Sequence, residues 1–154
     1  MSADVDLAKA IMTRWSASAA VTSQVPGGLQ TDMLTGDQDA SRAFESKERP
    51  YAKLELAMDR DPEFSSSGDR IEFHKVTITV WGLGRESMGP VVSAIRTAMG
   101  EDAPSGWTVN NTKAVMAIYP MSGMGMVREE QTKDGERLIR ATIPYAFWLH
   151  RSAM

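Results

Sequence analysis

The apolar positions near the N-terminus recur at helical spacing. Between residues 6 and 19 they follow one another at intervals of three and four, which predicts an amphipathic helix. Asp4 or Asp6 can cap it, because an acidic side chain accepts hydrogen bonds from first-turn amides at the positive end of the helix dipole. The Ser- and Ala-rich continuation ends at residues 26–28, Pro-Gly-Gly, where we predict a turn.

A second helical stripe occupies residues 88–99. It follows two glycines and contains Pro90. Since proline is tolerated in the first turn of a helix, where its missing amide hydrogen has no partner to lose, the helix is predicted to start within residues 87–89. Gly100 is predicted to end it.

The remaining apolar segments alternate with the period of a β-strand. The most β-branched of them, residues 71–81, is predicted to be a central strand. Residues 113–119 are apolar on both sides and therefore predict a buried strand. Pro144 implies that the last strand lies at an edge or carries a bulge. The other predicted strands are residues 29–34 (a short edge strand), 51–58 and 138–149.

The connections between these segments are polar. Residues 35–49 form a long predicted loop in which Phe44 is the one aromatic residue, and residues 59–69 predict a flexible hairpin connection. Asp134-Gly135 predicts a further hairpin turn. With no long crossovers between parallel strands, the order predicts one α+β domain spanning residues 1–154, an antiparallel or mixed sheet with two main helices packed on one face.

Composition narrows the function classes. The 154 residues fit one domain, and 42% hydrophobic with 24% charged residues is ordinary for a folded protein. The formal net charge of −3 supplies no overall positive field for nucleic acid. There is no cysteine, which removes disulfides and thiolate nucleophiles. No apolar stretch has the length of a membrane span and the N-terminus is acidic, so we expect a soluble protein that is not exported.

Nothing in the chain forms a catalytic motif. The only imidazoles, His74 and His150, lie on predicted strands outside any recognisable constellation, and we interpret both as surface or rim residues. Asp59, Asp61 and Glu63 have the alternate spacing of calcium ligands, but Phe64 stands where such a loop needs glycine. We interpret the acidic cluster as a solvated turn. We therefore expect no catalytic residue, no cofactor and no metal site.

The aromatic residues could in principle stack nucleic-acid bases. No basic residues are interleaved with them in the sequence, and an aromatic stripe on a strand is ordinarily core or interface, which is the interpretation we favour. Gly82 and Gly84 lack the third glycine of a phosphate-binding loop and are expected to end a strand. The aromatic residues concerned are Trp81, Trp107, Trp148, Tyr119 and Tyr145.

Methionine is concentrated late in the chain. Met116, Met121, Met124 and Met126 fall within one predicted strand and its exit. Such residues provide either a flexible apolar surface that adapts to a partner or a core edge filled with pliable side chains. The sequence leaves both interpretations open.

The order and spacing of several segments resemble the tail completion or tail terminator proteins of long-tailed bacteriophages. The resemblance covers most of the chain, although residues 35–49 form a longer loop than is typical and the chain after Phe147 is an addition. The matching segments are residues 6–11 opening the first helix, the Ser- and Ala-rich run to Val25, residues 50–52 entering a strand, residues 75–81 followed by the helix 88–99, and the hairpin at 134–135 leading to residues 140–147.

This resemblance implies a structural protein rather than an enzyme. It implies a ring, a hexamer in the family, that caps the tail tube and joins it to the neck or connector protein, with DNA passing through the lumen without specific binding and no contact with a membrane. The location implied is the virion tail or neck, after assembly in the host cytoplasm. Two alternatives stay open: another neck component, such as a head-closure or connector protein of the stopper or adaptor kind, and a small enzyme.

A ring needs two different contact patches on each subunit. Apolar residues that stand among polar or turn residues are the candidates for those patches, although each could equally pack locally against its own loop. The predicted interface residues are Phe44, Phe64, Met121, Met124 and Met126.

Overall fold

A computed structural model describes residues 5–31, 50–82, 84–100, 107–110, 112–121, 126–131 and 137–152. These residues form helices and strands in an order close to the predicted one. In chain order the elements are α1 (Val5–Ala17), α2 (Ala19–Gln24), β1 (Leu29–Gln30), β2 (Tyr51–Phe64), β3 (Arg70–Gly82), α5 (Arg85–Met99), β4 (Thr108–Asn110), β5 (Lys113–Pro120), β6 (Met126–Gln131) and β7 (Arg137–Arg151).

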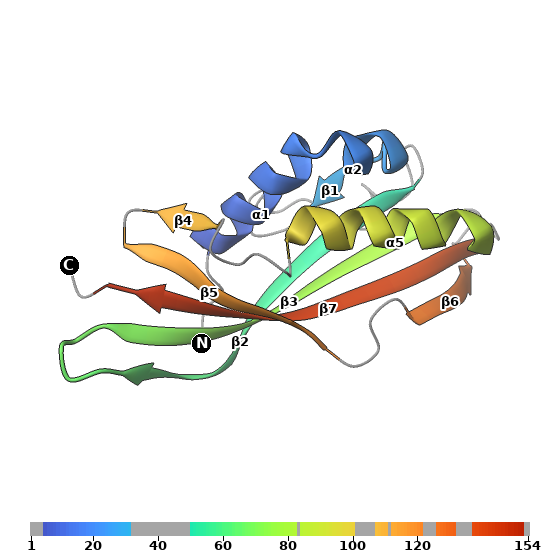
Figure 1. Cartoon of the computed structure of the whole chain (residues 1–154). Helices are drawn as coiled ribbons and strands as arrows, with labels where there is room; N and C mark the ends of the chain where they lie inside the picture. Colours follow the sequence, from blue (N-terminus) through green and yellow to red (C-terminus); the bar gives the residue numbers. More distant parts are fainter. Residues whose placement is uncertain are drawn as a thin grey trace.

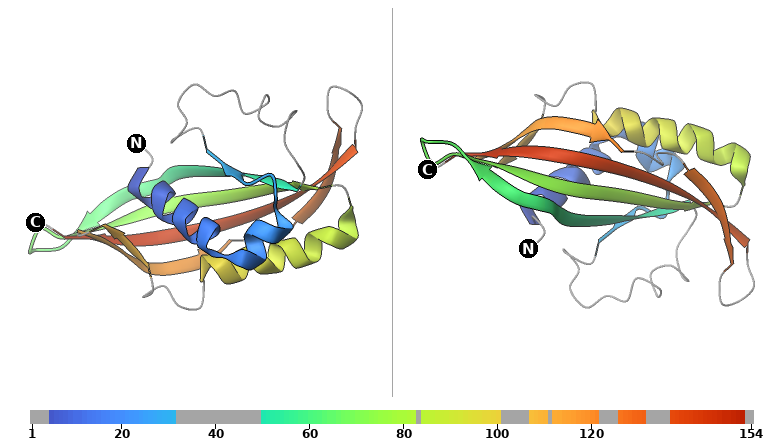
Figure 2. Two further views of the ribbon diagram at one scale, coloured as in Figure 1. Left: turned by 90° about the horizontal axis from the view of Figure 1, so that it is seen from above. Right: turned by 90° about the horizontal axis from the view of Figure 1, so that it is seen from below.

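The strands form one seven-stranded sheet, and the helices cover one of its faces (Figure 1). The strand order is β1-β2-β3-β7-β5-β4, with β6 also paired to β7. Among the strands that the structure describes, β1 and β2 run parallel, and the other pairings are antiparallel. Seen from above the helices lie in front of the strands, and seen from below the strands lie in front (Figure 2). The predicted α+β class with helices on one face is confirmed.

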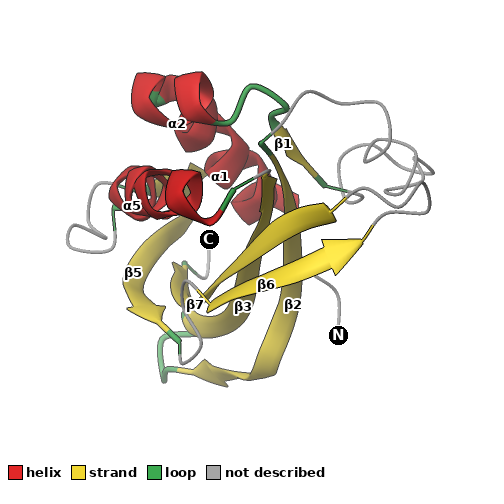
Figure 3. Ribbon diagram, turned by 90° about the vertical axis from the view of Figure 1, so that its right-hand side faces the viewer, coloured by secondary structure: helices red, strands yellow, loops and turns green. Residues whose placement is uncertain are grey.

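The core lies between the helices and the sheet, which curls beneath them (Figure 3). The predicted apolar stripes supply the helical side of this core, and alternate residues of the central strands supply the other. The core includes Leu7, Ile11 and Trp15 of α1, Met88, Val91, Ile95 and Met99 of α5, Leu54 of β2, Val76, Ile78 and Val80 of β3, and Ile143, Tyr145 and Phe147 of β7.

The first helix ends earlier than predicted. α1 stops at Ala17, and Ser18 takes an extended conformation (φ −91°, ψ 107°). Its hydroxyl accepts a hydrogen bond from the Val21 amide at 3.3 Å and so caps α2. A serine inside a helical stripe therefore marks a break between two helices.

Pro90 lies deeper in its helix than predicted. α5 begins at Arg85, with Gly84 as its N-cap, so Pro90 falls in the second turn and one hydrogen bond of the helix is missing. Gly89 and Pro90 are both exposed, which leaves the missing bond on the solvent side of the helix. Gly89 also lacks the Cβ that normally clashes with a following proline in helical conformation. The predicted start within residues 87–89 was wrong.

The C-terminus of α5 is held by side chains from elsewhere in the chain. Gly100 adopts the left-handed conformation with φ 61° and ends the helix, as predicted. The indole nitrogen of Trp107 donates to the Met99 carbonyl at 3.0 Å, and the Arg14 Nε donates to the Ala98 carbonyl at 3.0 Å. The Arg14 guanidinium also lies over the Trp107 ring, 4.5 Å from its centroid. Trp107 is thus a core residue with a capping function.

The predicted connection 59–69 is mostly strand. β2 continues to Phe64 with register shifts after Met58 and Arg60, and the turn is confined to Ser65–Asp69, where the Ser65 amide donates to the Asp69 carbonyl at 2.8 Å. The acidic residues there are exposed, as expected, but they lie along a strand rather than in a turn. Irregular pairing rather than a loop explains the weak alternation of this segment.

The strand predicted to be buried on both sides is buried on one. In β5, Val115 and Ile118 face the core, whereas Met116 and Tyr119 are 45% and 48% exposed. The pairing with β7 shifts between Val115 and Ala117, so Met116 is the extra residue of a bulge.

The last strand is central rather than at an edge. From Ile139 to Arg151, β7 pairs with the whole of β3 without a register shift, and it pairs with β5 and β6 on its other side. The Met121 amide donates to the Pro144 carbonyl at 3.0 Å, and the next pair on that side joins Met126 to Thr142. The N–H and C=O of one residue point to the same side of a strand. The missing amide hydrogen of Pro144 would therefore point toward the interruption between β5 and β6. The proline therefore marks a gap in the neighbouring strand.

Candidate interaction surfaces

The sheet face without helices carries a cluster of aromatic side chains that does not belong to the core. Cross-strand pairing places Arg60, Phe73, Trp148 and Ala117 in one row across β2, β3, β7 and β5. The Trp148 ring packs edge-on against Phe73 at 5.1 Å between centroids, and Tyr119 packs edge-on against Trp148 at 5.1 Å. These contacts build a rigid apolar platform on the outer side of the sheet.

Two cations accompany these aromatic residues. The Arg60 guanidinium lies 3.7 Å from the Phe73 centroid and 5.8 Å from that of Trp148, and Lys75 occupies the adjacent row between Ala57 and Ala146. Both cations are exposed, and in the part of the chain that the structure describes neither forms an ion pair with a carboxylate. We call Arg60, Lys75, Tyr119 and Trp148 the basic–aromatic patch.

The end of the β2–β3 hairpin has the opposite character. Phe64 is 68% exposed and stands opposite Arg70, the last pair before the turn. Asp61 and Glu63 are exposed beside it, and neither has an ion-pair partner among the described residues. We call Asp61, Glu63 and Phe64 the hairpin tip. It combines an apolar group with two exposed carboxylates, at one end of the molecule (Figure 1).

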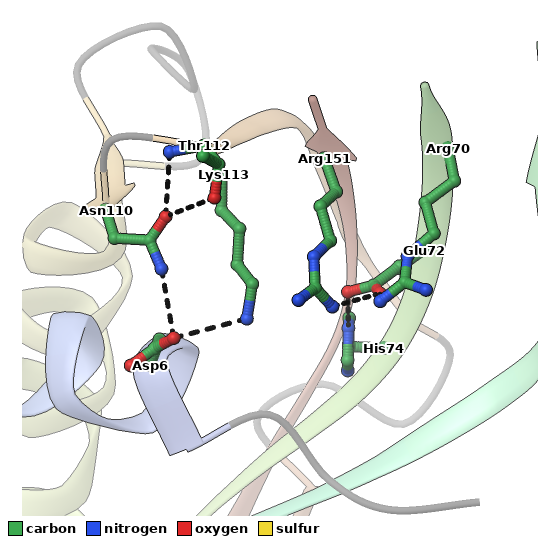
Figure 4. A network of polar contacts seen from close by, with 8 residues as sticks. All are labelled: Asp6, Arg70, Glu72, His74, Asn110, Thr112, Lys113 and Arg151. Atoms are coloured by element: carbon green, nitrogen blue, oxygen red, sulfur yellow. Dashed lines mark hydrogen bonds and ion pairs between the residues drawn. The ribbon is translucent and has the colours of Figure 1, made fainter. Parts of the chain in front are cut away.

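A buried charge cluster joins β3 to β7 on the helix-facing side (Figure 4). The Glu72 carboxylate, 5% exposed, pairs with Arg70, receives the Arg151 guanidinium at 3.5 Å and lies 3.3 Å from the His74 Nε2. His74 is 1% exposed, so its predicted surface position was wrong, whereas the side chain of His150 is 41% exposed, as expected. With the carboxylate and the imidazole enclosed and two arginines on one carboxylate, the cluster is suited to joining strands.

A second polar network lies beside this cluster. Asp6, in the first turn of α1, accepts hydrogen bonds from the Asn110 side chain at 3.0 Å and from Lys113 at 3.2 Å (Figure 4). Asn110 in turn accepts from the Thr112 amide at 2.9 Å. Asp6 thus ties the start of α1 to the β4–β5 turn in addition to its favourable place at the helix N-terminus.

The structure does not bring the predicted interface residues together. Phe64 is exposed at the hairpin tip, whereas Met121 is partly buried beside Pro144. Phe64 lies in the row of Arg151 and Met121 lies beside Pro144. These two positions of β7 are about 23 Å apart at the usual strand rise. The backbone of Met126 pairs with Thr142. Phe44 and Met124 lie outside the described residues.

Sequence reasoning missed the basic–aromatic patch because its members come from four strands. Arg60 and Lys75 are far from Tyr119 and Trp148 in the sequence, and only the pairing register makes them neighbours. The aromatic residues were predicted to lie in the core or at an interface, and the structure shows both environments. Trp107 and Tyr145 are buried, whereas Tyr119 is half exposed. The alternation in residues 71–81 gave the only available signal, since it put Lys75 on the face opposite Val76.

Among the described residues no group of three or more His, Asp and Glu side chains could hold a metal ion, and none of the described helices is long and apolar enough to span a membrane.

The fold is similar to that of a virion protein. No family model matches the chain, and no curated protein sequence matches it. A solved chain from a structure described as the virion of a native gene transfer agent particle superimposes with a TM-score of 0.61 at 11% identity. The superposition covers 94% of this chain and 94% of that chain. At this identity the likeness establishes a shared fold over nearly the full length of both.

Proposed function

We propose that this protein is a structural subunit of a phage-like virion, in which copies of it form a ring at the neck or tail. The observation that carries the proposal is the superposition over 94% of both chains on a chain of a virion particle. The order and spacing of segments that resemble tail terminators supports the same role. Under this proposal the ring, a hexamer, terminates the tail tube and joins it to the connector, and the protein is not an enzyme.

The surfaces of the subunit support this proposal. One sheet face is packed against the helices, while the other exposes an aromatic cluster with two cations that have no ion-pair partner among the described residues, and an acidic hairpin tip projects at one end. These are two different patches on one chain, which is what a cyclic assembly requires. The enclosed position of Glu72 and His74 argues against an acid–base role for that pair, because a substrate would need to reach them.

The solution mass of the purified chain tests the proposal. Six copies of a 16.9 kDa chain give about 101 kDa, and we expect light scattering coupled to size exclusion to find a species of that size and negative-stain images to show rings. A chain that stays monomeric at concentrations of milligrams per millilitre would contradict the ring. Rings that bind isolated heads rather than tails would instead favour a head-closure or connector protein.

A further inference from the structure

We propose that the hairpin tip of one copy docks on the basic–aromatic patch of a second copy of this chain. This proposal deepens the proposed function. It rests on that function in one respect, which is that copies of the chain associate. It identifies the two patches of the subunit contact: Asp61, Glu63 and Phe64 on one side, and Arg60, Lys75, Tyr119 and Trp148 on the other.

Charge complementarity is the first argument. The tip carries two exposed carboxylates, and the patch carries two exposed cations, and in the part of the chain described by the structure none of the four has an ion-pair partner. Opposite charges that face one another across an interface steer association and set its register. Lys75 is flanked by Ala57 and Ala146, small side chains that leave its ammonium accessible to a partner.

The apolar groups match as well. Phe64 is 68% exposed at the tip, and Tyr119 is 48% exposed at the rim of the patch. Aromatic side chains that meet at the centre of an interface with charged residues around them provide much of its binding energy. Docking would remove both exposed rings from water in one contact.

Phe64 of the tip cannot reach the Lys75 part of the patch on its own chain. Phe64 stands opposite Arg70, and Lys75 lies five residues further along the same strand, about 16 Å away at the usual rise. The hairpin is paired with β7 on its inner side, which holds it straight. Because the tip and the patch are different surfaces, each copy can use its tip on one neighbour and its patch on the other, and the contact repeats from subunit to subunit.

A protein partner fits this patch better than a nucleic acid does. Base stacking needs free ring faces, but the Arg60 guanidinium lies over the Phe73 ring, and the Trp148 ring already makes edge-to-face contacts with both Phe73 and Tyr119. The accessible chemistry is therefore a pair of cations beside apolar surface, and an acidic tip with a phenyl ring is complementary to it.

Charge reversal tests the docking in a way that separates it from effects on folding. Glu63→Lys places a cation of the tip against the cations of the patch, and Lys75→Glu places a carboxylate of the patch against those of the tip. Each variant alone is therefore expected to lose most of the assembled species at about 50 mM salt. A one-to-one mixture of the two variants is expected to recover it, because the altered tip of one fits the altered patch of the other. Lys9→Glu, on the exposed side of α1, is the matched control and should assemble normally.

Cross-linking provides an independent measurement. The chain has no cysteine, so Ser66→Cys and Tyr119→Cys introduce the only thiols. The double variant is expected to form a ladder of disulfide-linked oligomers, whereas each single variant can form at most a dimer. Thr13→Cys in place of Tyr119→Cys, on the helical side of the molecule, should give no ladder.

Three results would overturn the docking. Assembly that is unaffected by either reversal, or variants that fail to recover when mixed although circular dichroism shows them folded, would place the subunit contact elsewhere and leave the proposed ring intact. DNA binding that is lost in Lys75→Glu would assign the patch to nucleic acid. A wild-type chain that does not assemble, together with a double cysteine variant that gives no ladder, would contradict the proposed function itself.

Discussion

Arg14 shows how one side chain can join three parts of this fold. It comes from α1, donates to a carbonyl in the last turn of α5 and lies over the Trp107 ring. The last carbonyls of a helix have no partner within it, and a cation is favourable at its negative end. Gly100 keeps the space open, because a Cβ there would lie 2.7 Å from the Arg14 Nη2.

Replacing Arg14 therefore has a predictable cost. Arg14→Met keeps much of the stem and removes the hydrogen bond and the contact of the guanidinium with the ring, and we expect it to lower the free energy of unfolding by about 1–3 kcal/mol. Denaturant titration measures this. Lys9→Met, an exposed position on the same helix, should change the stability by less than about 0.5 kcal/mol. An equal loss in both variants would contradict the capping role of Arg14.

Residue chemistry predicted some single positions and missed others. Gly100 ends α5 as its type suggests, because a left-handed residue at a helix end favours glycine. His74 was misplaced, since histidine is commonly exposed and its buried partner Glu72 stands two residues away among alternating strand positions. Two polar residues at alternate strand positions give the same sequence pattern whether their side chains face water or two arginine partners.

At the scale of elements, periodicity predicted most helices and strands because each has one apolar side. The exceptions are places where pairing is irregular. β2 loses its alternation at the register shifts after Met58 and Arg60, so its second half looked like a loop. Pro144 suggested an edge strand, yet β7 is central. A central strand tolerates a proline where the neighbouring strand has no carbonyl that needs a hydrogen bond from that residue. Pairing partners cannot be seen in one strand's sequence.

The two sides of β3 should respond differently to substitution. Val76 is fully buried against the helices, whereas its neighbour Lys75 is exposed on the outer face. Val76→Ala removes two buried methyl groups and is expected to lower the free energy of unfolding by about 2 kcal/mol. Lys75→Ala should leave stability within about 0.5 kcal/mol of the wild type while weakening assembly.

Thermal unfolding combined with light scattering separates these two effects. A large loss of stability in Lys75→Ala would show that the outer face contributes to the fold rather than to a contact between copies. A Val76→Ala chain as stable as the wild type would show that the helices do not depend on this strand.

At the scale of the whole molecule, both layers depend on β7. Phe147 faces the helices and packs edge-on against Trp107 at 5.4 Å between centroids, and the next residue, Trp148, packs on the outer face against Phe73 at 5.1 Å. Adjacent residues of one central strand thus anchor the core and the aromatic cluster. The composition predicts one domain, and because both layers pack on this shared strand we expect them to unfold together.

Unfolding measured from the two sides of the sheet should therefore give one transition. Among the four tryptophans, Trp107 reports on the core and Trp148 on the outer face. In two variants, each keeping one of these and replacing the other tryptophans by phenylalanine, we expect the fluorescence midpoint to coincide with that of far-ultraviolet circular dichroism. The two variants can differ in stability, because the comparison is made within each of them. An outer-face signal that is lost at lower denaturant than the circular dichroism would show that the β2–β3 hairpin opens separately, and that the surface proposed to dock is ordered only by its partner.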